Sequence, residues 1–159
     1  MLRKVFVIAA VMLAGCAPVG PAASPGPIRA ISYETGACFG TCPVYGVTVS
    51  SNGTGRFEGR RFTAATEPRS FTVTPAQFAA FEAALAPYRP KSGKADYSGP
   101  PLCERMATDM PSVDIDWDGP EPAHLHYYYG CDREKYAAMA DALRHAVDVL
   151  PIGALIRAP

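Results

Sequence analysis

The sequence has no excess of charge of either sign. Its 15 lysine and arginine residues are matched by 15 aspartate and glutamate residues. Removal of an N-terminal segment that contains Arg3 and Lys4 leaves only a slight acidic surplus. Such a chain has no basic field to attract nucleic acid and no polybasic patch to hold a membrane surface. The balance therefore predicts that nucleic acid is not a partner.

The short motifs that mark common catalytic sites are also missing. The chain has no G-x-S-x-G nucleophile turn, no H-E-x-x-H zinc motif and no glycine-rich phosphate loop. The D-x-D-x-D-G run at 114–119 is similar to the start of an EF-hand calcium loop. However, Leu125 occupies the twelfth position, where a bidentate glutamate is required. His145 is expected to be solvated on the polar side of a helix. We therefore predict no cofactor, and the sequence favours a protein that is not an enzyme.

Hydrophobic runs are short. The apolar run at 5–14 follows two basic residues and is too short for a stable transmembrane helix, which needs about 20 residues. It ends in L-A-G-C at 13–16, and together these features resemble a bacterial lipoprotein signal. The resemblance implies cleavage before Cys16, diacylglycerol on its sulfur and N-acylation, commonly with palmitate. Ala17 in place of aspartate implies sorting to the outer membrane of a Gram-negative bacterium. An ordinary secretory signal with an incidental cysteine is the alternative.

Proline and glycine divide the remaining chain. We expect a signal peptide at 1–15 and a lipidated, Pro/Gly-rich tether at 16–28, because that composition cannot form a core. A single domain is expected at 29–150, a length sufficient for one hydrophobic core. Residues 151–159 are expected to be a C-terminal tail. The membrane would then be contacted through the N-terminal lipid, with the domain facing the periplasm.

Alternation of apolar and polar residues predicts an antiparallel sheet. An Asn-Gly turn at 52–53 joins two strands into a first hairpin, because both residues tolerate positive φ. Residues 118–122 form the loop of a second hairpin. Strands are expected at 30–34, 44–50, 54–58, 61–64, 69–73, 113–118 and 123–129.

Two helices are expected, one after each group of strands. Thr74 can cap the first helix and Gln77 can complete a capping box, and Pro87 ends the helix. Asp132 is expected to cap the second helix, and Pro151 ends it. Strands followed by a helix, twice over, predict an α+β domain: an antiparallel sheet of two hairpins plus short strands, with two helices packed on one face.

A long connection at 87–111 has no clear period. Loops of this length are uncommon in compact domains unless they are functional or held in place. Cys103 lies within the connection, so we expect a covalent link to hold it.

Several segments together resemble the family called domain of unknown function 6438. The run C-F-G-T-C-P-V-Y at 38–45 carries most of the resemblance, supported by Asn-Gly at 52–53, F-E-G at 57–59 and T-D-M-P-S at 108–112. The family occurs in bacterial exported proteins and lipoproteins and has no assigned activity. The resemblance implies one domain over roughly residues 30–150 and supplies no catalytic role.

Four cysteines follow Cys16, namely Cys38, Cys42, Cys103 and Cys131. An even number in an exported protein is typical of two disulfides, and four cysteines allow three pairings. The family pattern and the loop lengths together favour Cys38–Cys42 and Cys103–Cys131. These links would restrict the unfolded chain by roughly 2 and 3.6 kcal/mol.

The Cys38–Cys42 segment leaves other chemistry open. Thioredoxin-type motifs have two residues between the cysteines and place the first at a helix N-terminus, whereas three residues intervene here and a strand follows. Zinc sites generally use C-x2-C pairs. A structural disulfide is therefore favoured over a thiol-redox centre or a four-cysteine zinc site.

The second hairpin places acidic and imidazole side chains on one face. With 118–122 as the loop, Asp116 opposes His124 and Asp114 opposes His126, with Cβ atoms about 4.5–5.5 Å apart. Such a set could bind zinc, nickel or copper. Simple exposed ion pairs are the favoured alternative.

Tyrosines give the candidate binding residues. Aromatic side chains are common anchors at interfaces, which favours Tyr127, Tyr128 and Tyr129, with Tyr97 in the long connection. The favoured alternative is that these residues are divided between the core and the sheet surface. The sequence as a whole predicts an outer-membrane lipoprotein whose disulfide-linked domain binds an envelope protein or peptide. A thiol-redox or metal-dependent activity is the alternative function.

Overall fold

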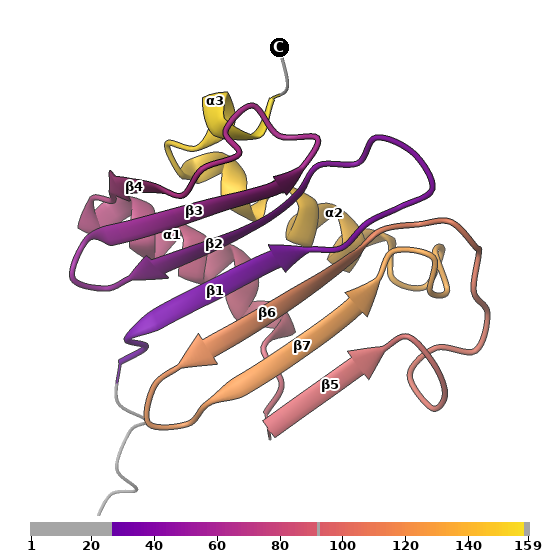
Figure 1. Ribbon diagram of the computed structural model, residues 1–159. Coiled ribbons are helices and arrows are strands. Elements are labelled where there is room, and N and C mark those ends of the chain that lie inside the picture. Colours follow the sequence, from indigo (N-terminus) through magenta and orange to yellow (C-terminus); the bar gives the residue numbers. More distant parts are fainter. Residues whose placement is uncertain (1–26, 92, 158–159) are drawn as a thin grey trace, which may run out of the picture.

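The computed structural model describes residues 27–91 and 93–157. They form one seven-stranded sheet with helices beside it, in the strand order β4-β3-β2-β1-β6-β7-β5 (Figure 1). The expected α+β class is confirmed. The strands are β1 Ala30–Thr35, β2 Val44–Ser50, β3 Thr54–Arg61, β4 Arg69–Thr72, β5 Gly93–Tyr97, β6 Ser112–Asp118 and β7 Ala123–Tyr128.

Antiparallel pairing accounts for every neighbouring pair in the sheet except β5 with β7. In the β6–β7 pair, Trp117 lies opposite Ala123 and Asp114 opposite His126, the register expected from the turn length. Alternate residues of the strands face the core, where the apolar side chains of β1, β2, β6 and β7 are buried. The other face carries the polar side chains.

The first helix, α1 (Pro75–Leu85), begins where its sequence predicts. The Thr74 side chain accepts a hydrogen bond from the Gln77 amide, and the Gln77 side chain accepts one from the Thr74 amide. Phe78, Phe81 and Leu85 are buried. A 3-10 turn, η1 (Ala86–Tyr88), follows, so the expected stop at Pro87 comes within this turn.

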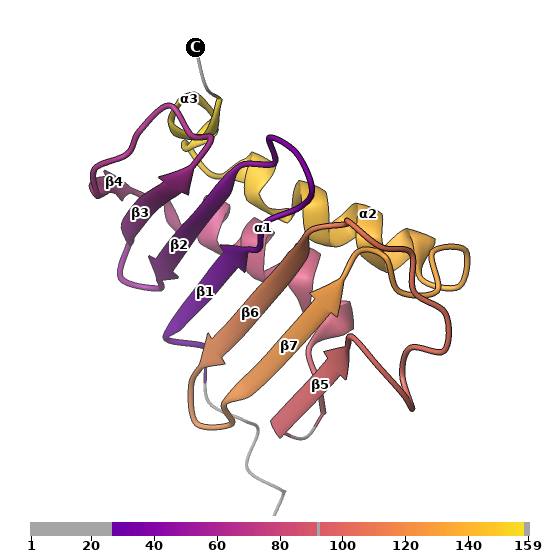
Figure 2. The same cartoon turned by 45° about the vertical axis from the view of Figure 1, so that its right-hand side comes forward.

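The second helix, α2 (Ala137–His145), continues into the 3-10 turn η2 (Ala146–Val149). Both α1 and α2 lie behind the sheet in Figure 1, and Figure 2 shows them on the same side after rotation. The Tyr33 hydroxyl of β1 donates to the carbonyl of Leu143 in α2, and its ring contacts Phe81 of α1. Side chains on both helices thus pack against one row of the sheet.

The expectation for Asp132 was wrong. Tyr136, not Asp132, occupies the N-cap position of α2, and it makes no side-chain capping bond. The Asp132 carboxylate instead accepts hydrogen bonds from the backbone amides of Glu104 and Arg105. A contact between distant chain segments therefore replaces the local cap.

The long connection at 87–111 contains a strand that the sequence did not indicate. β5 pairs in parallel with β7, with Ala95 opposite Leu125 and Tyr97 opposite Tyr127. Its sequence, GKADY, alternates Lys94 and Asp96 with Ala95 and Tyr97, but the run is short and contains no β-branched residue. Pairing with β7, and not local propensity, makes this segment extended.

Two further expectations need correction. Residues 61–64 do not form a separate strand, because β3 continues to Arg61 and the chain then turns. Residues 151–157 do not behave as a tail: Ile152 is fully buried, and Gly153–Ile156 form the short helix α3. The Ala65 amide also donates to the carbonyl of Leu155. The packed domain thus extends past Leu150.

Among the described residues, no helix is long and apolar enough to cross a membrane. The expected signal at 1–15, the lipidation site Cys16 and nearly all of the tether at 16–28 lie outside the residues that the structure describes.

Candidate functional site

The four cysteines are joined in the expected pairs. Cys38 is bonded to Cys42 and Cys103 to Cys131, with Cα–Cα distances of 5.8 and 5.5 Å. The first bond closes the connection between β1 and β2. The second, buried, bond ties the connection after β5 to the end of β7. Bonded in this way, the sulfur atoms offer no thiolate to bind a metal.

Each imidazole of the β6–β7 hairpin lies closest to the carboxylate directly opposite it, and His124 Nε2 also lies 3.6 Å from Asp114 Oδ1. His124 Nδ1 lies 2.7 Å from Asp116 Oδ1, and His126 Nδ1 lies 2.7 Å from Asp114 Oδ1. These contacts lie on the sheet face turned away from the helices. They match the cross-strand ion pairs considered from the sequence.

Metal ligands converge elsewhere in the described part of the chain. Among the described residues, one group has three potential ligand atoms within 4.8 Å of one another, and no other group does. It consists of Cys103, Cys131 and Asp132. The two sulfurs of that group are bonded to each other. The carboxylates and imidazoles of the hairpin do not gather around one point in this way.

A small hollow of about 290 Å³ lies on the outer face of the sheet over Gly46, where the row of side chains is interrupted. Its carboxylates already have partners. Glu34 pairs with Arg60, Glu58 pairs with Arg56 at 2.7 Å, and Asp116 pairs with His124. This hollow therefore presents few groups that still need a ligand.

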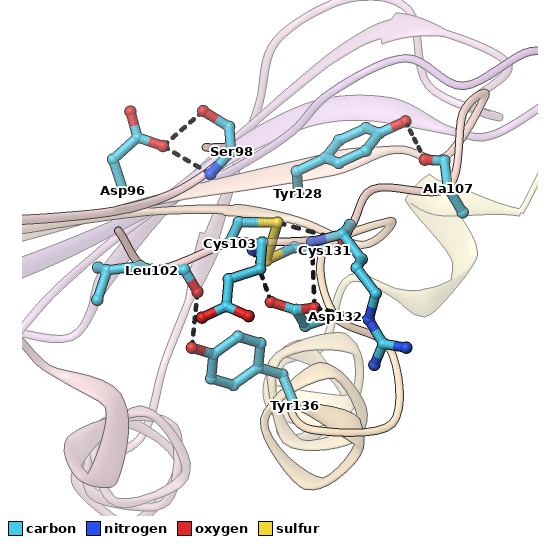
Figure 3. The surroundings of a disulfide bond; sticks show 11 residues. Asp96, Ser98, Leu102, Cys103, Ala107, Tyr128, Cys131, Asp132 and Tyr136 are labelled. Carbon is cyan, nitrogen blue, oxygen red and sulfur yellow. Dashed lines mark hydrogen bonds and ion pairs between the residues drawn. A yellow bond between two sulfur atoms is a disulfide. The ribbon is translucent and has the colours of Figure 1, made fainter. Parts of the chain in front are cut away.

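Asp132 organises the loop at the end of β7. Its carboxylate accepts from the Glu104 amide at 2.8 Å and from the Arg105 amide at 3.2 Å, and its side chain is only 4% exposed. The amide of Glu104, and then that of Arg105, holds the pKa of Asp132 below its ordinary value. Figure 3 shows this carboxylate beside the Cys103–Cys131 bond. The disulfide and the carboxylate together fix one wall of a cavity.

Three of the four candidate tyrosines meet on the inner face of the sheet. Tyr127 contacts Tyr129 and Tyr97 edge to face, with ring centroids 5.1 and 5.9 Å apart. Tyr136 completes the cluster at 5.0 Å from Tyr97, and its hydroxyl donates to the carbonyl of Leu102 (Figure 3). Tyr127 and Tyr129 are buried, so they are not surface anchors, and the favoured expectation that the tyrosines are divided between core and sheet surface holds for them.

Tyr128 points to the opposite side of β7 from its neighbours. Its hydroxyl donates to the carbonyl of Ala107 at 2.9 Å (Figure 3). It also accepts from the Met110 amide at 3.2 Å. Its polar group is thus used within the domain. The alternative division of the tyrosines between core and sheet surface describes them better, because side chains alternate along a strand.

A cavity of about 790 Å³ lies between α2, the end of β7 and the loop at 105–107. We call it the tyrosine pocket. Tyr127 and Tyr129 lie against it, Ala137 and Ala140 of α2 form an apolar wall, and Met106 lies on its edge with 56% of its surface exposed. The charged residues around it are Arg105, Asp132, Arg133, Glu134, Asp141 and Arg144.

Two residues that line this pocket carry buried hydroxyl groups with no hydrogen-bond partner among the described residues. They are Tyr127, which is fully buried, and Tyr129, which is 5% exposed. The Tyr33 hydroxyl neighbours that of Tyr129 without meeting hydrogen-bond geometry, and it donates instead to Leu143. Burial raises the pKa of Tyr129 to about 12 and also raises that of Tyr127. Both phenols therefore keep their protons at neutral pH and can donate hydrogen bonds.

Arg144 brings a positive charge to the same place. Its guanidinium carbon lies 4.3 Å from the ring centroid of Tyr129. A guanidinium stacked on an aromatic face keeps its N–H groups available at the edges of its plane. Within the described ranges, Arg144 makes no ion pair.

Comparison with models of protein families shows to which family the chain belongs. The family described as "Domain of unknown function (DUF6438)" matches residues 29–149. The chain belongs to this family. No curated protein and no solved structure matches the chain. These comparisons therefore assign no activity to the DUF6438 domain.

Two of the sequence segments that suggested the family, 38–45 and 108–112, lie side by side in the DUF6438 domain. The amide of Phe39, between the first two cysteines, donates to the carbonyl of Asp109 at 3.2 Å. The Gly36 amide likewise donates to the carbonyl of Ser112 at 2.8 Å. The connection between β1 and β2 thus lies beside residues 109–112, at the end of the connection between β5 and β6. The same connection supplies residues 105–107 to the tyrosine pocket.

Sequence reasoning found part of the pocket and missed the rest. Tyr127 and Tyr129 were candidates, although for an exposed surface. Arg144 and Arg133 were not singled out, because charged residues on a predicted helix or in a loop are usually solvated. The helical spacing of Ala137, Ala140 and Arg144 was the available signal that they share one face.

Proposed function

We propose that this chain is a lipid-anchored protein of the bacterial envelope whose DUF6438 domain binds an envelope ligand in the tyrosine pocket. The membrane is the outer membrane of a Gram-negative bacterium, and the domain faces the periplasm. The observation that carries the binding role is Tyr127: it lines the pocket, and its buried hydroxyl has no hydrogen-bond partner within the described ranges. A buried polar group left unpaired costs about 1–3 kcal/mol, and a ligand that accepts its hydrogen bond would remove that cost.

The position of the pocket supports this arrangement. Ala30, where β1 begins, pairs with Asp118 at one end of the sheet, whereas Tyr128 pairs with Ser112 at the other end. Six residues of strand separate the two ends by about 20 Å. The chain enters the domain at the end far from the pocket, so an N-terminal anchor would leave the pocket open to the periplasm.

The anchor is supported by the L-A-G-C sequence at 13–16. Cys16→Ser should abolish incorporation of radioactive fatty acid and release the protein from membranes. Ala17→Asp should retain the label but move the protein from outer-membrane to inner-membrane fractions. Membrane attachment that persists in the Cys16→Ser protein would contradict the lipid anchor.

Binding in the pocket can be tested in living cells with a photo-crosslinking amino acid. Placed at Met106 on the pocket edge, it should form a light-dependent adduct with an envelope component. Tyr127→Phe in the same protein should weaken that adduct. Ala79, on the exposed side of α1, is the matched control position. Equal adducts at positions 106 and 79, or an absence of adducts at both, would refute the pocket as the binding site.

A further inference from the structure

We propose that the tyrosine pocket recognises the free carboxylate of a short peptide, with Tyr127, Tyr129 and Arg144 as its donors. This inference rests on the proposed binding function and identifies the chemistry of the ligand. It depends on three features of the pocket: its unpartnered donors, its charge and its size.

The three donor residues line the same pocket. Tyr127 and Tyr129 lie two residues apart on the same face of the chain, with rings 5.1 Å apart. Both are protonated at neutral pH, because burial raises their pKa values. The guanidinium of Arg144 lies on the Tyr129 ring. Toward an anion, a hydroxyl and a guanidinium both act as hydrogen-bond donors. A carboxylate has two oxygens that accept several hydrogen bonds at once.

The charge around the pocket favours a ligand with a single negative charge. Three arginines line it, but so do three acidic residues, Asp132, Glu134 and Asp141. Asp132 is already satisfied by two backbone amides, whereas Glu134 and Asp141 are exposed, and Asp141 Oδ1 lies 3.6 Å from His145 Nε2. A phosphate dianion would meet these carboxylates unfavourably. A peptide terminus carries one negative charge, and its amino group could lie near Asp141 or Glu134.

The size of the pocket agrees with a small ligand. Its volume of about 790 Å³ falls within the range of roughly 300–1,000 Å³ that is typical of small-molecule sites. The apolar wall of Ala137 and Ala140 would contact small side chains. A ligand of two or three residues with a free C-terminus fits these limits.

The test uses the purified protein with both disulfides formed and three probes: trialanine, trialaninamide and inorganic phosphate. Titration followed by NMR should show trialanine shifting the amide signals of Tyr129, Gly130 and Ala140. Trialaninamide should bind at least about tenfold more weakly, since it lacks the charged acceptor. Phosphate should not displace trialanine.

Variants locate the interaction. Tyr127→Phe removes only a hydroxyl, and Arg144→Gln removes the charge, so each should weaken trialanine binding several-fold while the protein remains folded by its melting curve. Arg69→Gln, on β4 away from the pocket, should bind as the original protein does.

Several results would overturn the inference. They are equal binding of trialanine and its amide, no binding of trialanine, displacement of trialanine by phosphate, and unchanged binding in Tyr127→Phe. If the crosslink at Met106 persists under any of these results, the proposed binding function stands and only the carboxylate chemistry fails. If that crosslink is also absent, the proposed function fails with it.

Discussion

At the scale of single residues, Gly59 occupies a position in β3 where a side chain does not fit. A Cβ atom built there would lie 1.8 Å from the carbonyl oxygen of Ala65 and 2.4 Å from the Thr63 hydroxyl. The loop that follows β3 folds back over this glycine. Its backbone cannot withdraw easily, because the Ala65 amide is bonded to the C-terminal segment at Leu155.

Gly59→Ala should therefore lower the free energy of unfolding by about 1–3 kcal/mol, the usual cost of overpacking. Thermal and urea unfolding measure the change. Gly99→Ala is the matched control, since a Cβ at Gly99 would meet no atom within 4 Å. Similar losses of stability in the two variants would show that crowding at Gly59 is not the cause.

Asp132 links stability to pH. Its pKa is lowered in the folded state by the amides of Glu104 and Arg105. A carboxyl group whose folded pKa is depressed stabilises the fold above the unfolded pKa of about 3.9, and the contribution is lost as the pH falls through the folded pKa. The free energy of unfolding should thus fall below about pH 4, and the fall should be shallower in Asp132→Asn.

Urea unfolding at a series of pH values tests this expectation. Glu67→Gln, in the turn before β4, removes a charge from an exposed position and is the control. The same acid sensitivity in the Asp132→Asn protein and the original would exclude Asp132 as its source.

At the scale of secondary-structure elements, the connection between β5 and β6 depends on links to other parts of the chain. Cys103–Cys131, the Asp132 carboxylate and the bridge between Met106 and Cys131 hold it against the end of β7. The connection also supplies Arg105, Met106 and Ala107 to the tyrosine pocket. Stability and ligand binding should therefore depend on the same covalent link.

The two disulfides should differ in their effect on stability. Their sequence separations are 28 and 4 residues, which correspond to about 3.6 and 2 kcal/mol in the loop-entropy model. Replacing Cys103 and Cys131 by serine should destabilise the protein more than replacing Cys38 and Cys42.

Hydrogen exchange adds a local measurement to these variants. The amides of Cys103 and Ala107, which are bonded to backbone carbonyls, should lose protection when the Cys103–Cys131 bond is removed. They should keep it when the Cys38–Cys42 bond is removed. The reverse order of stability or protection would contradict this role of the buried disulfide.

At the scale of the whole molecule, the packed domain begins before and ends after the limits expected from the sequence. Ile28 is 5% exposed, and Ile152 is fully buried. The short helix α3 contacts β3 through the loop at 62–66. The C-terminal segment therefore covers an end of the core.

A chain that stops after Leu150 should be less stable than one that stops after Arg157. Loss of the buried Ile152 side chain alone should cost about 2–3 kcal/mol. Melting temperatures of the two chains measure the effect, and Ile152→Ala in the longer chain separates the side chain from the segment. Equal melting temperatures for the two chains would show that the domain does end at Leu150.

Local patterns in the sequence determined much of the sheet and the first helix. Alternation of apolar residues predicted β2, β6 and β7, because a strand with one buried face must repeat every two residues. The length of the turn at 118–122 predicted the pairing of Asp116 with His124. Thr74 and Gln77 marked the start of α1, because a capping box satisfies amides within four residues.

Only the tertiary structure decided the features that join distant segments. β5 is a strand because it pairs with β7, and Asp132 serves the loop at 104–105 in place of its own helix. The tyrosine pocket combines β7, α2 and the loop at 105–107. The sequence around each of these residues gives no sign that they share a pocket. The unpartnered hydroxyl of Tyr127 and the guanidinium of Arg144 come together only because the sheet and the helix pack against each other.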